Sequence, residues 1–208
     1  RFYQNLMVYG EAVDGAFVRS LLKRFPISVI MGKQELVERL SGDAGDGYIL
    51  RCKRLCMLEG EDALQPAAGR ARRAEPADAG RVHRFLQSLP EFTSLYASGE
   101  MIADRIRNND GIHLMLERDG EIVSHGNSTA GAGRTVMLGG VGTAPAFRGR
   151  GYASEIVSAL SRAVLAEGKK PCVFCGRGPE ENLFDRLGFR TVGGWATLEA
   201  VERTGLDE

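Results

Sequence analysis

The sequence predicts an α/β fold in which a mixed, mostly antiparallel sheet is flanked by helices. Two observations in the second half of the chain lead to this prediction. Strand-like apolar stretches lie on both sides of 118–120, an Arg-Asp-Gly segment, and a third follows after a short glycine-containing loop, which is typical of antiparallel strands joined by tight turns. Further on, a helical segment separates two strand-like segments, and this order indicates a parallel pair. We therefore expect one sheet with an antiparallel half and a parallel half.

The first 60 residues predict a strand–helix–strand–helix–strand run. Phe17, Leu21 and Leu22 have helical spacing, as do Leu36, Val37 and Leu40 further on. The β-branched segment between these helices, 27–31, is bounded by Pro26 and Gly32. The expected elements are strands over 5–9, 27–31 and 48–58 and helices over 16–24 and 33–40.

A second set of elements follows an aperiodic stretch at 59–69, where we place the boundary between a partial N-terminal β/α region (1–62) and a C-terminal domain (63–208). Pro76 opens one helix in this set, and Ser98 is expected to cap the next one. Gly168 and Gly188 are placed to end two later helices. The expected strands are 70–74, 112–117, 122–128, 135–143, 171–175 and 191–200, with helices from 75, from 98, over 152–167 and over 179–187.

Composition and charge exclude several classes of protein. Lys and Arg number 27 and Asp and Glu 27, so the net charge is +0, and 43% of the residues are hydrophobic. This balance argues against disorder and against the broad phosphate attraction of nucleic-acid binders. The sequence has no apolar stretch of membrane-spanning length and its first residues lack a signal-peptide pattern, so we expect a cytoplasmic protein without membrane or nucleic-acid partners. The chain begins with Arg1 rather than Met, so the number of elements expected in the first 60 residues is a minimum.

Four cysteines fall into two close pairs, Cys52 with Cys56 and Cys172 with Cys175. The second pair lies in a predicted strand, where residues three apart point to opposite faces and cannot share a metal ion. No matching C-x-x-C pair exists elsewhere. We therefore expect no metal site.

Glycine is abundant, at 27 residues, and five of them lie between Gly139 and Gly151, where a strand becomes a helix. A helix N-terminus presents unpaired N–H groups, and glycines allow the backbone to approach a pyrophosphate closely. Arg148 and Arg150 add cations that suit phosphate oxygens. The alternative is a tight turn that only permits close packing, with both arginines solvated.

Two other phosphate-binding motifs fit this segment poorly. Gly149-x-Gly151 resembles the start of a dinucleotide fingerprint, but Ser154 occupies the third glycine position and no acidic residue ends the next strand. A Walker loop requires Gly-Lys-Ser/Thr, which is absent here.

Two segments together resemble the GNAT acetyltransferases. Arg148-x-x-Gly151-x-Ala153 is similar to the acetyl-CoA signature of that family, Arg/Gln-x-x-Gly-x-Gly/Ala. The segment from Asn182 to Phe189 is similar to the family's Asn…Tyr…Leu-Gly-Phe segment. The resemblance covers about residues 70–200, and the expected element order also fits the GNAT fold. The first 60 residues resemble the degenerate N-terminal half of some bacterial members.

The resemblance implies an N-acetyltransferase that moves an acetyl group from acetyl-CoA to a primary amine of a small molecule, by direct attack in a ternary complex. It implies that backbone groups around Val141 and Thr143 hold the pantetheine and polarise the thioester, and that the turn 148–154 holds the pyrophosphate. We expect a monomer or a homodimer. A catalytically silent acyl-CoA-binding module is the alternative. The implied cofactor-binding residues are Val141, Gly142, Thr143, Arg148, Gly149, Arg150, Gly151, Tyr152, Ala153, Ser154, Asn182 and Phe184.

The sequence departs from the family pattern at the catalytic groups. Phe184 stands where many members have the Tyr that is thought to protonate the CoA sulfur, and Phe has no proton to give. The strand 135–143 lacks the Glu that some members use as a base. Glu91 and His125 are therefore the candidate bases, although Glu91 also fits a solvated loop charge and His125 a hydrogen-bonded strand residue. The two other histidines, at positions 83 and 113, are weaker candidates.

Overall fold

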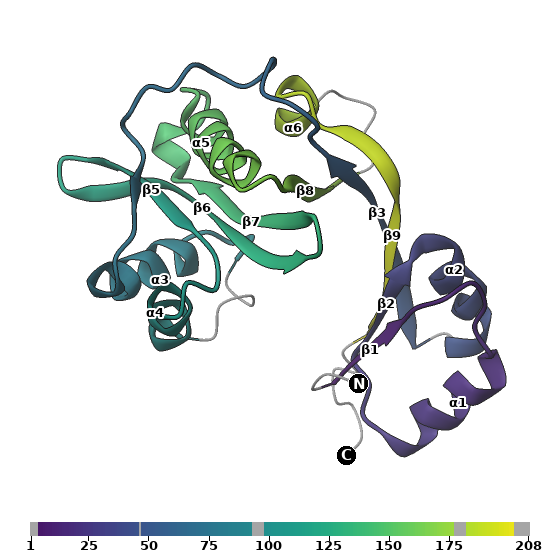
Figure 1. The fold of residues 1–208 in the computed structure, drawn as a ribbon. Helices are drawn as coiled ribbons and strands as arrows, with labels where there is room; N and C mark the ends of the chain where they lie inside the picture. The colour runs from purple at the N-terminus through teal and green to yellow at the C-terminus, as the bar shows by residue number, and fades with distance from the viewer. Residues whose placement is uncertain (1–3, 46, 93–97, 177–181, 202–208) are drawn as a thin grey trace. The chain divides into compact units, whose positions relative to one another are not determined.

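The computed structural model describes residues 4–45, 47–92, 98–176 and 182–201 (Figure 1). The chain divides into two compact units, which are described separately. The first unit combines 1–56 with 174–179 and 191–208, and the second combines 57–173 with 180–190. The expected division at residue 62/63 differs from this one in two ways: the boundary falls at 56/57, and the last strand belongs with the N-terminal residues.

The first unit is a sheet whose strands follow the order β1-β2-β9-β3, with two helices. Strand β1 runs parallel to β2, which runs antiparallel to β9. Ile30, Val37 and Leu198 are buried in the core between helices and sheet. The backbone N–H groups of Ala16 and Phe17 donate to Asp14, which caps the first helix. The elements are β1 (Asn5–Val8), α1 (Gly15–Arg24), β2 (Val29–Lys33), α2 (Gln34–Ala44), β3 (Tyr48–Met57) and β9 (Arg190–Ala200).

The second unit contains the strand order β8-β7-β6-β5-β4. Its neighbours from β4 to β7 are antiparallel, and β7 and β8 are parallel. The predicted mixed and mostly antiparallel sheet is therefore confirmed. Its strands are β4 (Arg72–Arg73), β5 (His113–Arg118), β6 (Glu121–Ala132), β7 (Thr135–Thr143) and β8 (Lys170–Cys175).

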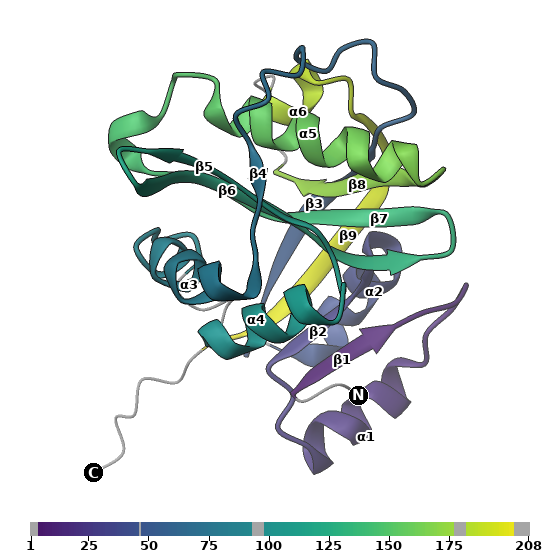
Figure 2. The ribbon, with the colours of Figure 1, turned by 60° about the vertical axis from the view of Figure 1, so that its left-hand side comes forward.

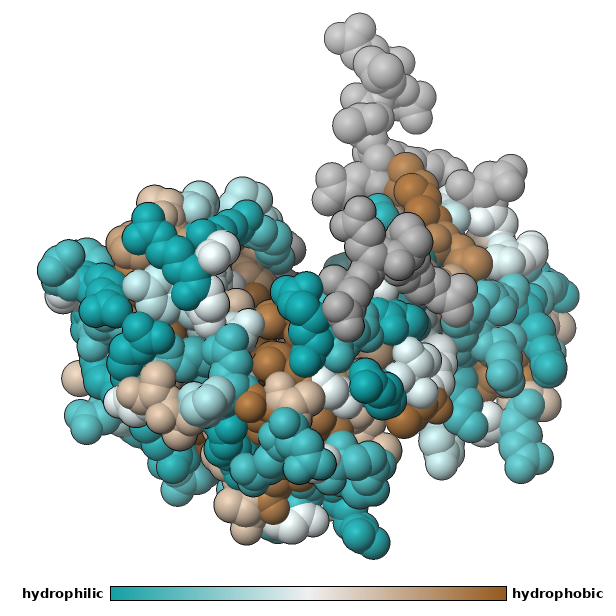
Figure 3. Space-filling model, turned by 90° about the horizontal axis from the view of Figure 1, so that it is seen from above, coloured by the Kyte–Doolittle hydropathy of each residue, from teal (hydrophilic) through white to brown (hydrophobic). Residues whose placement is uncertain are grey.

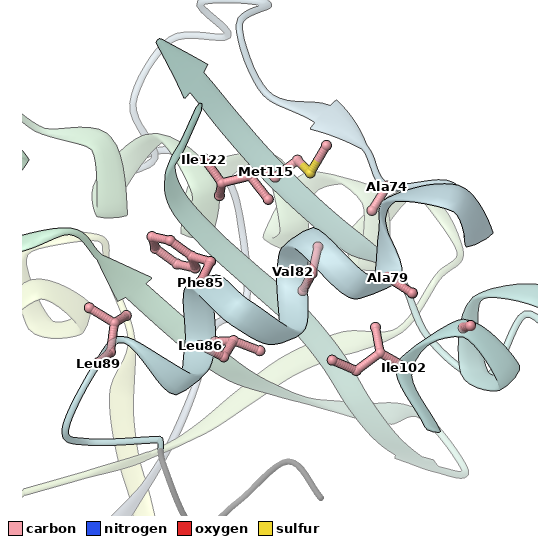
Figure 4. Close-up of a cluster of buried hydrophobic side chains, with 10 residues drawn as sticks. Ala74, Ala79, Val82, Phe85, Leu86, Leu89, Ile102, Met115 and Ile122 are labelled. Atoms are coloured by element: carbon pink, nitrogen blue, oxygen red, sulfur yellow. The ribbon is translucent and has the colours of Figure 1, made fainter. Parts of the chain in front are cut away.

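Helices cover both faces of this sheet (Figures 1 and 2). On one face, Val82, Leu86 and Ile102 pack against Met115 and Ile122 of the strands, as Figure 4 shows. On the other face lies the longest helix, α5, whose buried side chains recur at helical spacing. The helices of the unit are η1 (Pro76–Asp78), α3 (Ala79–Gln87), α4 (Gly99–Arg107), η2 (Pro145–Phe147), α5 (Tyr152–Ala166) and α6 (Leu183–Arg186).

Local signals in the sequence account for the ends of several elements. The turn between β5 and β6 places Asp119 at φ +52° and Gly120 at φ +81°, left-handed conformations that Asp-Gly favours in two-residue hairpins. Ser98 accepts a hydrogen bond from the backbone N–H of Met101 and so caps α4, as predicted. The strand expected over 70–74 is shorter. Of the helix expected over 179–187, residues 179–181 lie outside the described residues, and the described part is helical only over α6, between the caps Asn182 and Leu187.

The surface in Figure 3 is mostly hydrophilic, with separate hydrophobic patches. Each helix in the described ranges is too short or too polar to span a membrane.

Candidate functional site

The C-terminal half of β7 extends beyond its pairing with β8. The register joins Thr135 to Lys170 and Met137 to Cys172 and does not extend over the six residues from Leu138 to Thr143. On its other side β7 stays paired to β6 up to Thr143. The last residues of β7 thus form an open strand edge, with backbone groups available to an extended ligand.

Directly after this edge the chain makes the glycine-rich turn. Gly149 and Gly151 have φ angles of +76° and +81°, the left-handed region that a residue without Cβ adopts at little cost. Gly151 is the N-cap of α5 and offers no side chain to satisfy the first N–H groups of the helix. These N–H groups and the positive end of the helix dipole are suited to bind an anion.

The strand edge and the turn line one cavity of about 510 Å³. Of the residues implied by the resemblance, nine line this cavity, and so does the candidate base Glu91. The sequence reasoning missed five further lining residues, three of them in or beside the loops 88–92 and 145–147 and two in α6. The lining is Leu89, Glu91, Phe92, Val141, Gly142, Thr143, Phe147, Arg148, Gly149, Gly151, Tyr152, Ala153, Ser154, Leu183 and Arg186.

Three implied cofactor-binding residues do not line the cavity. The guanidinium of Arg150 lies over the ring of Phe147, 5.4 Å from its centroid. Asn182 Oδ1 accepts from the backbone N–H groups of Phe184 and Asp185, so this side chain caps α6. The ring of Phe184 packs edge-on against Phe189. Helix α6 instead turns Leu183 and Arg186 toward the cavity. A motif match alone does not show which face of a helix lines a cavity.

The cations near the turn have partners in this structure. Arg148 donates from Nε to the carbonyl oxygen of Thr143, at 3.1 Å, and from a terminal nitrogen to Glu91 Oε1, at 2.8 Å. Glu155, in the first turn of α5, is buried and forms an ion pair with Arg70. Arg70 thereby neutralises the negative charge of Glu155, which would otherwise repel an anion at the start of α5.

Glu91 lies at the cavity but is a weak base in this arrangement. A hydrogen bond from its own backbone N–H, together with Arg148, lowers the pKa of its carboxyl group. A lowered pKa favours the carboxylate and reduces its tendency to accept a proton from an amine.

His125 does not reach the cavity. It has no exposed surface, and both ring nitrogens are occupied: Nδ1 lies 3.0 Å from the carbonyl oxygen of Gly140 and Nε2 lies 3.2 Å from Nδ1 of His113. Burial lowers the pKa of His125 to about 4 and that of His113 to about 3. This geometry argues against His125 as the base for an amine in the cavity and favours its interpretation as a hydrogen-bonded strand residue.

A larger cavity, of about 690 Å³, lies at the opposite end of β7. It is lined by Arg73, Arg105 and Lys169 among others, but Arg105 donates to the carbonyl oxygens of Asp110 and Thr129, and Lys169 pairs with Glu167. The residues that line this cavity include no helix N-terminus, so the smaller cavity fits a pyrophosphate better.

The cysteines in the described residues are free thiols, and burial raises the pKa of Cys172. A search of the same residues for three or more clustered His, Cys, Asp or Glu side chains finds no candidate metal site.

Comparisons with known proteins show which family model and which folds the chain resembles. Residues 132–200 match the family model "FR47-like protein". No curated protein matches the sequence. A GCN5-related N-acetyltransferase from Kribbella flavida shares the fold with a TM-score of 0.68 at 17% identity, and the match covers 92% of this chain and 78% of that chain. One from Sphaerobacter thermophilus has a TM-score of 0.65 at 15% identity, over 93% of this chain and 67% of that chain. A GCN5-related N-acetyltransferase-like protein from Streptococcus suis has a TM-score of 0.60 at 15% identity, over 94% of this chain and 78% of that chain. The matched model covers β7, the glycine turn and α5, and the solved structures show that the chain has the fold of GCN5-related N-acetyltransferases.

Proposed function

We propose that this protein is an N-acetyltransferase that transfers the acetyl group of acetyl-CoA to a primary amine of a small molecule, by direct attack in a ternary complex. The observation that carries the proposal is the single cavity that joins the open edge of β7 to the N-terminus of α5. An extended thioester arm and a pyrophosphate require these two features side by side.

The residues present fit acetyl-CoA. The strand edge at Val141 and Thr143 offers backbone donors and acceptors to the pantetheine amides. The N–H groups at the start of α5 suit the pyrophosphate, and Arg186 adds a cation to the same lining. Leu89, Phe92 and Phe147 supply apolar walls, which exclude water. Bound here, acetyl-CoA would supply an activated acetyl thioester.

The chain's own contribution would be mainly orientation. Holding an amine next to a bound thioester in the correct geometry lowers a barrier by up to about 7–11 kcal/mol in favourable cases. Backbone N–H groups of β7 that point at the thioester oxygen would stabilise the charge that develops there. The amine must lose a proton. Among the described residues that line the cavity the one carboxylate is Glu91, which is paired with Arg148, so we assign this proton to a water molecule.

A catalytically silent acyl-CoA-binding module is the second candidate. Phe184 favours it, because its ring packs against Phe189 and has no proton to donate to a leaving thiolate. The two candidates share the cofactor site and differ only in turnover.

Two measurements separate these functions. Calorimetry with CoA and acetyl-CoA measures binding, and release of free thiol from acetyl-CoA across a panel of primary amines measures transfer. Binding together with amine-dependent thiol release, and a product heavier by one acetyl group, supports the acetyltransferase. Binding without release on any amine supports the silent module, and no binding refutes both.

The cofactor site is tested separately with Arg148→Ala/Arg150→Ala. We expect weaker CoA binding in this double variant, because a cationic turn is lost. Arg51→Ala, which removes an exposed arginine of the first unit that pairs with Glu199, is the matched control and should bind CoA like the unaltered protein. Equal affinity in all three proteins would contradict the assignment of the turn.

A further inference from the structure

Two side chains of β6 hold two peptide carbonyls of β7. His125 Nδ1 lies 3.0 Å from the carbonyl oxygen of Gly140, and Ser124 Oγ donates to the carbonyl oxygen of Gly142 at 2.9 Å. Both side chains are fully buried. The two contacts therefore act inside the sheet, directly behind the open part of β7.

The orientation of the next N–H groups follows from the planarity of the peptide. The peptide bonds between described residues are all trans, so the carbonyl of Gly140 and the N–H of Val141 point in opposite directions. The same holds for the carbonyl of Gly142 and the N–H of Thr143. Successive residues of a strand direct their N–H groups to alternate sides. The N–H of Ala144 donates to the carbonyl oxygen of Val123 in β6. The N–H groups of Val141 and Thr143 thus point away from β6, and both residues line the cavity.

The histidine pair has one arrangement of protons. A carbonyl oxygen only accepts hydrogen bonds, so Nδ1 of His125 carries the proton that it donates to Gly140. Nε2 of the neutral ring is then bare and accepts from Nδ1 of His113, 3.2 Å away. His113 holds its own proton on Nδ1, and its buried Nε2 has no hydrogen-bond partner. His113 thereby fixes the tautomer of His125 that donates to β7.

We propose that His125 is a positioning residue: it holds the Gly140–Val141 peptide so that the N–H of Val141 is directed at the carbonyl oxygen of a bound acyl thioester, and His113 keeps it in the required tautomer. The inference rests on the proposed function, because it assumes an acyl-CoA in the cavity. It assigns to the two histidines a role in orienting a donor, in place of proton transfer.

This peptide requires such support. Gly140 has φ +56°, a conformation available mainly to glycine, and it follows another glycine in the strand. Pairing with β8 has ended three residues earlier, at Met137. The register with β6 also shifts between His125 and Asn127, opposite this segment. A strand segment with so few constraints could rotate its peptide, and the bond from His125 opposes that rotation.

The test is infrared spectroscopy of bound acetyl-CoA, ¹³C-labelled at the thioester carbonyl. Donation by Val141 weakens the carbonyl bond, so the band of the bound thioester should lie at lower wavenumber than that of free acetyl-CoA. His125→Phe removes the donor to Gly140, and the band should return toward its free position. His125→Asn is the matched control, since its Nδ2 lies where Nδ1 of histidine lies, and it should keep most of the shift.

Turnover gives a second readout. Removing a hydrogen-bond donor to the reacting oxygen typically lowers kcat by about 10²–10³. A donor that is present but misdirected should lower kcat by less, so we expect His125→Phe to lower kcat about tenfold. Its KM for acetyl-CoA and its affinity for S-ethyl-CoA, which has no carbonyl, should stay within about threefold, because only the acyl oxygen loses its partner. His113→Leu removes the partner that fixes the tautomer of His125, so it should move the band in the same direction by a smaller amount. This variant replaces His125→Phe as the test if circular dichroism shows that His125→Phe does not fold.

The outcomes are distinct. A band displaced in His125→Phe and kept in His125→Asn supports the inference. A band that stays at its wild-type position in His125→Phe and in His113→Leu, or moves equally in His125→Phe and His125→Asn, overturns it while leaving the proposed function intact. If the unaltered protein binds no acetyl-CoA, the proposed function fails and this inference fails with it.

Discussion

The buried histidine pair predicts a steep loss of stability in mild acid. His113 and His125 have pKa values of about 3 and about 4 in the folded protein, against an ordinary value of 6.5. The unfolded chain therefore binds protons on these rings as the pH falls below about 6.5, whereas the folded protein does not until about pH 4. The stabilising contribution is complete above pH 6.5 and is lost as the pH falls from 6.5 to about 4 for His125 and to about 3 for His113.

The size of the effect follows from linkage. Between pH 6 and pH 5, each histidine that is neutral only in the folded state lowers the free energy of unfolding by about 1 kcal/mol, so the pair lowers it by about 2 kcal/mol. His113→Leu should reduce the loss over this interval by about half. Carboxylates also titrate here, but they are common to both proteins and cancel in the difference.

Urea unfolding followed by far-ultraviolet circular dichroism at pH 7.5, 6 and 5 measures these values. Fluorescence is unsuitable, because the single tryptophan, Trp195, lies in the first unit and the histidines lie in the second. Equal pH dependence in the unaltered protein and in His113→Leu would refute the reasoning, since it would mean that His113 is protonated alike in the folded and unfolded states.

Three other substitutions test separate parts of the structure. Gly142→Ala should lower the free energy of unfolding by about 1–3 kcal/mol in urea titrations, because its Cβ would lie 2.5 Å from Leu89 Cδ1; an unchanged midpoint contradicts this packing. Asn182→Ala removes the cap of α6 and should lower the free energy of unfolding by about 1 kcal/mol. Asn182→Asp keeps the hydrogen-bond acceptor and should lower it by less; equal losses in the two variants would contradict the capping role. Ser124→Ala should weaken CoA binding about fivefold in calorimetry, because the Thr143 N–H loses its support, and unaltered affinity argues against that support.

Periodicity and end signals predict most of the fold. The apolar stripes of α3 and α5, the Asp-Gly turn before β6 and the Ser98 cap are local features, so the sequence carries them in a few adjacent residues. The assignment of β9 to the first unit depends on pairing with β2, which lies more than 150 residues earlier in the chain. No local pattern encodes that partner.

The candidate site was predictable in part, for the same reason. The turn 148–154 is contiguous in the sequence, and most of its residues line the cavity. Leu183 and Arg186 were missed because their exposure to the cavity depends on how α6 packs. The interpretation of His125 also depended on partners that only the structure supplies, namely the carbonyl of Gly140 and the ring of His113. Its burial turns a candidate base into a structural donor.

The most direct test of the cofactor site is amide hydrogen exchange, measured by mass spectrometry with and without acetyl-CoA. We predict slower exchange in peptides that cover Val141–Ser154, because the strand edge and the N-terminus of α5 would then have hydrogen-bond partners. Protection centred on the residues around Arg73 and Arg105, at the other cavity, or no protection at all, would contradict the account.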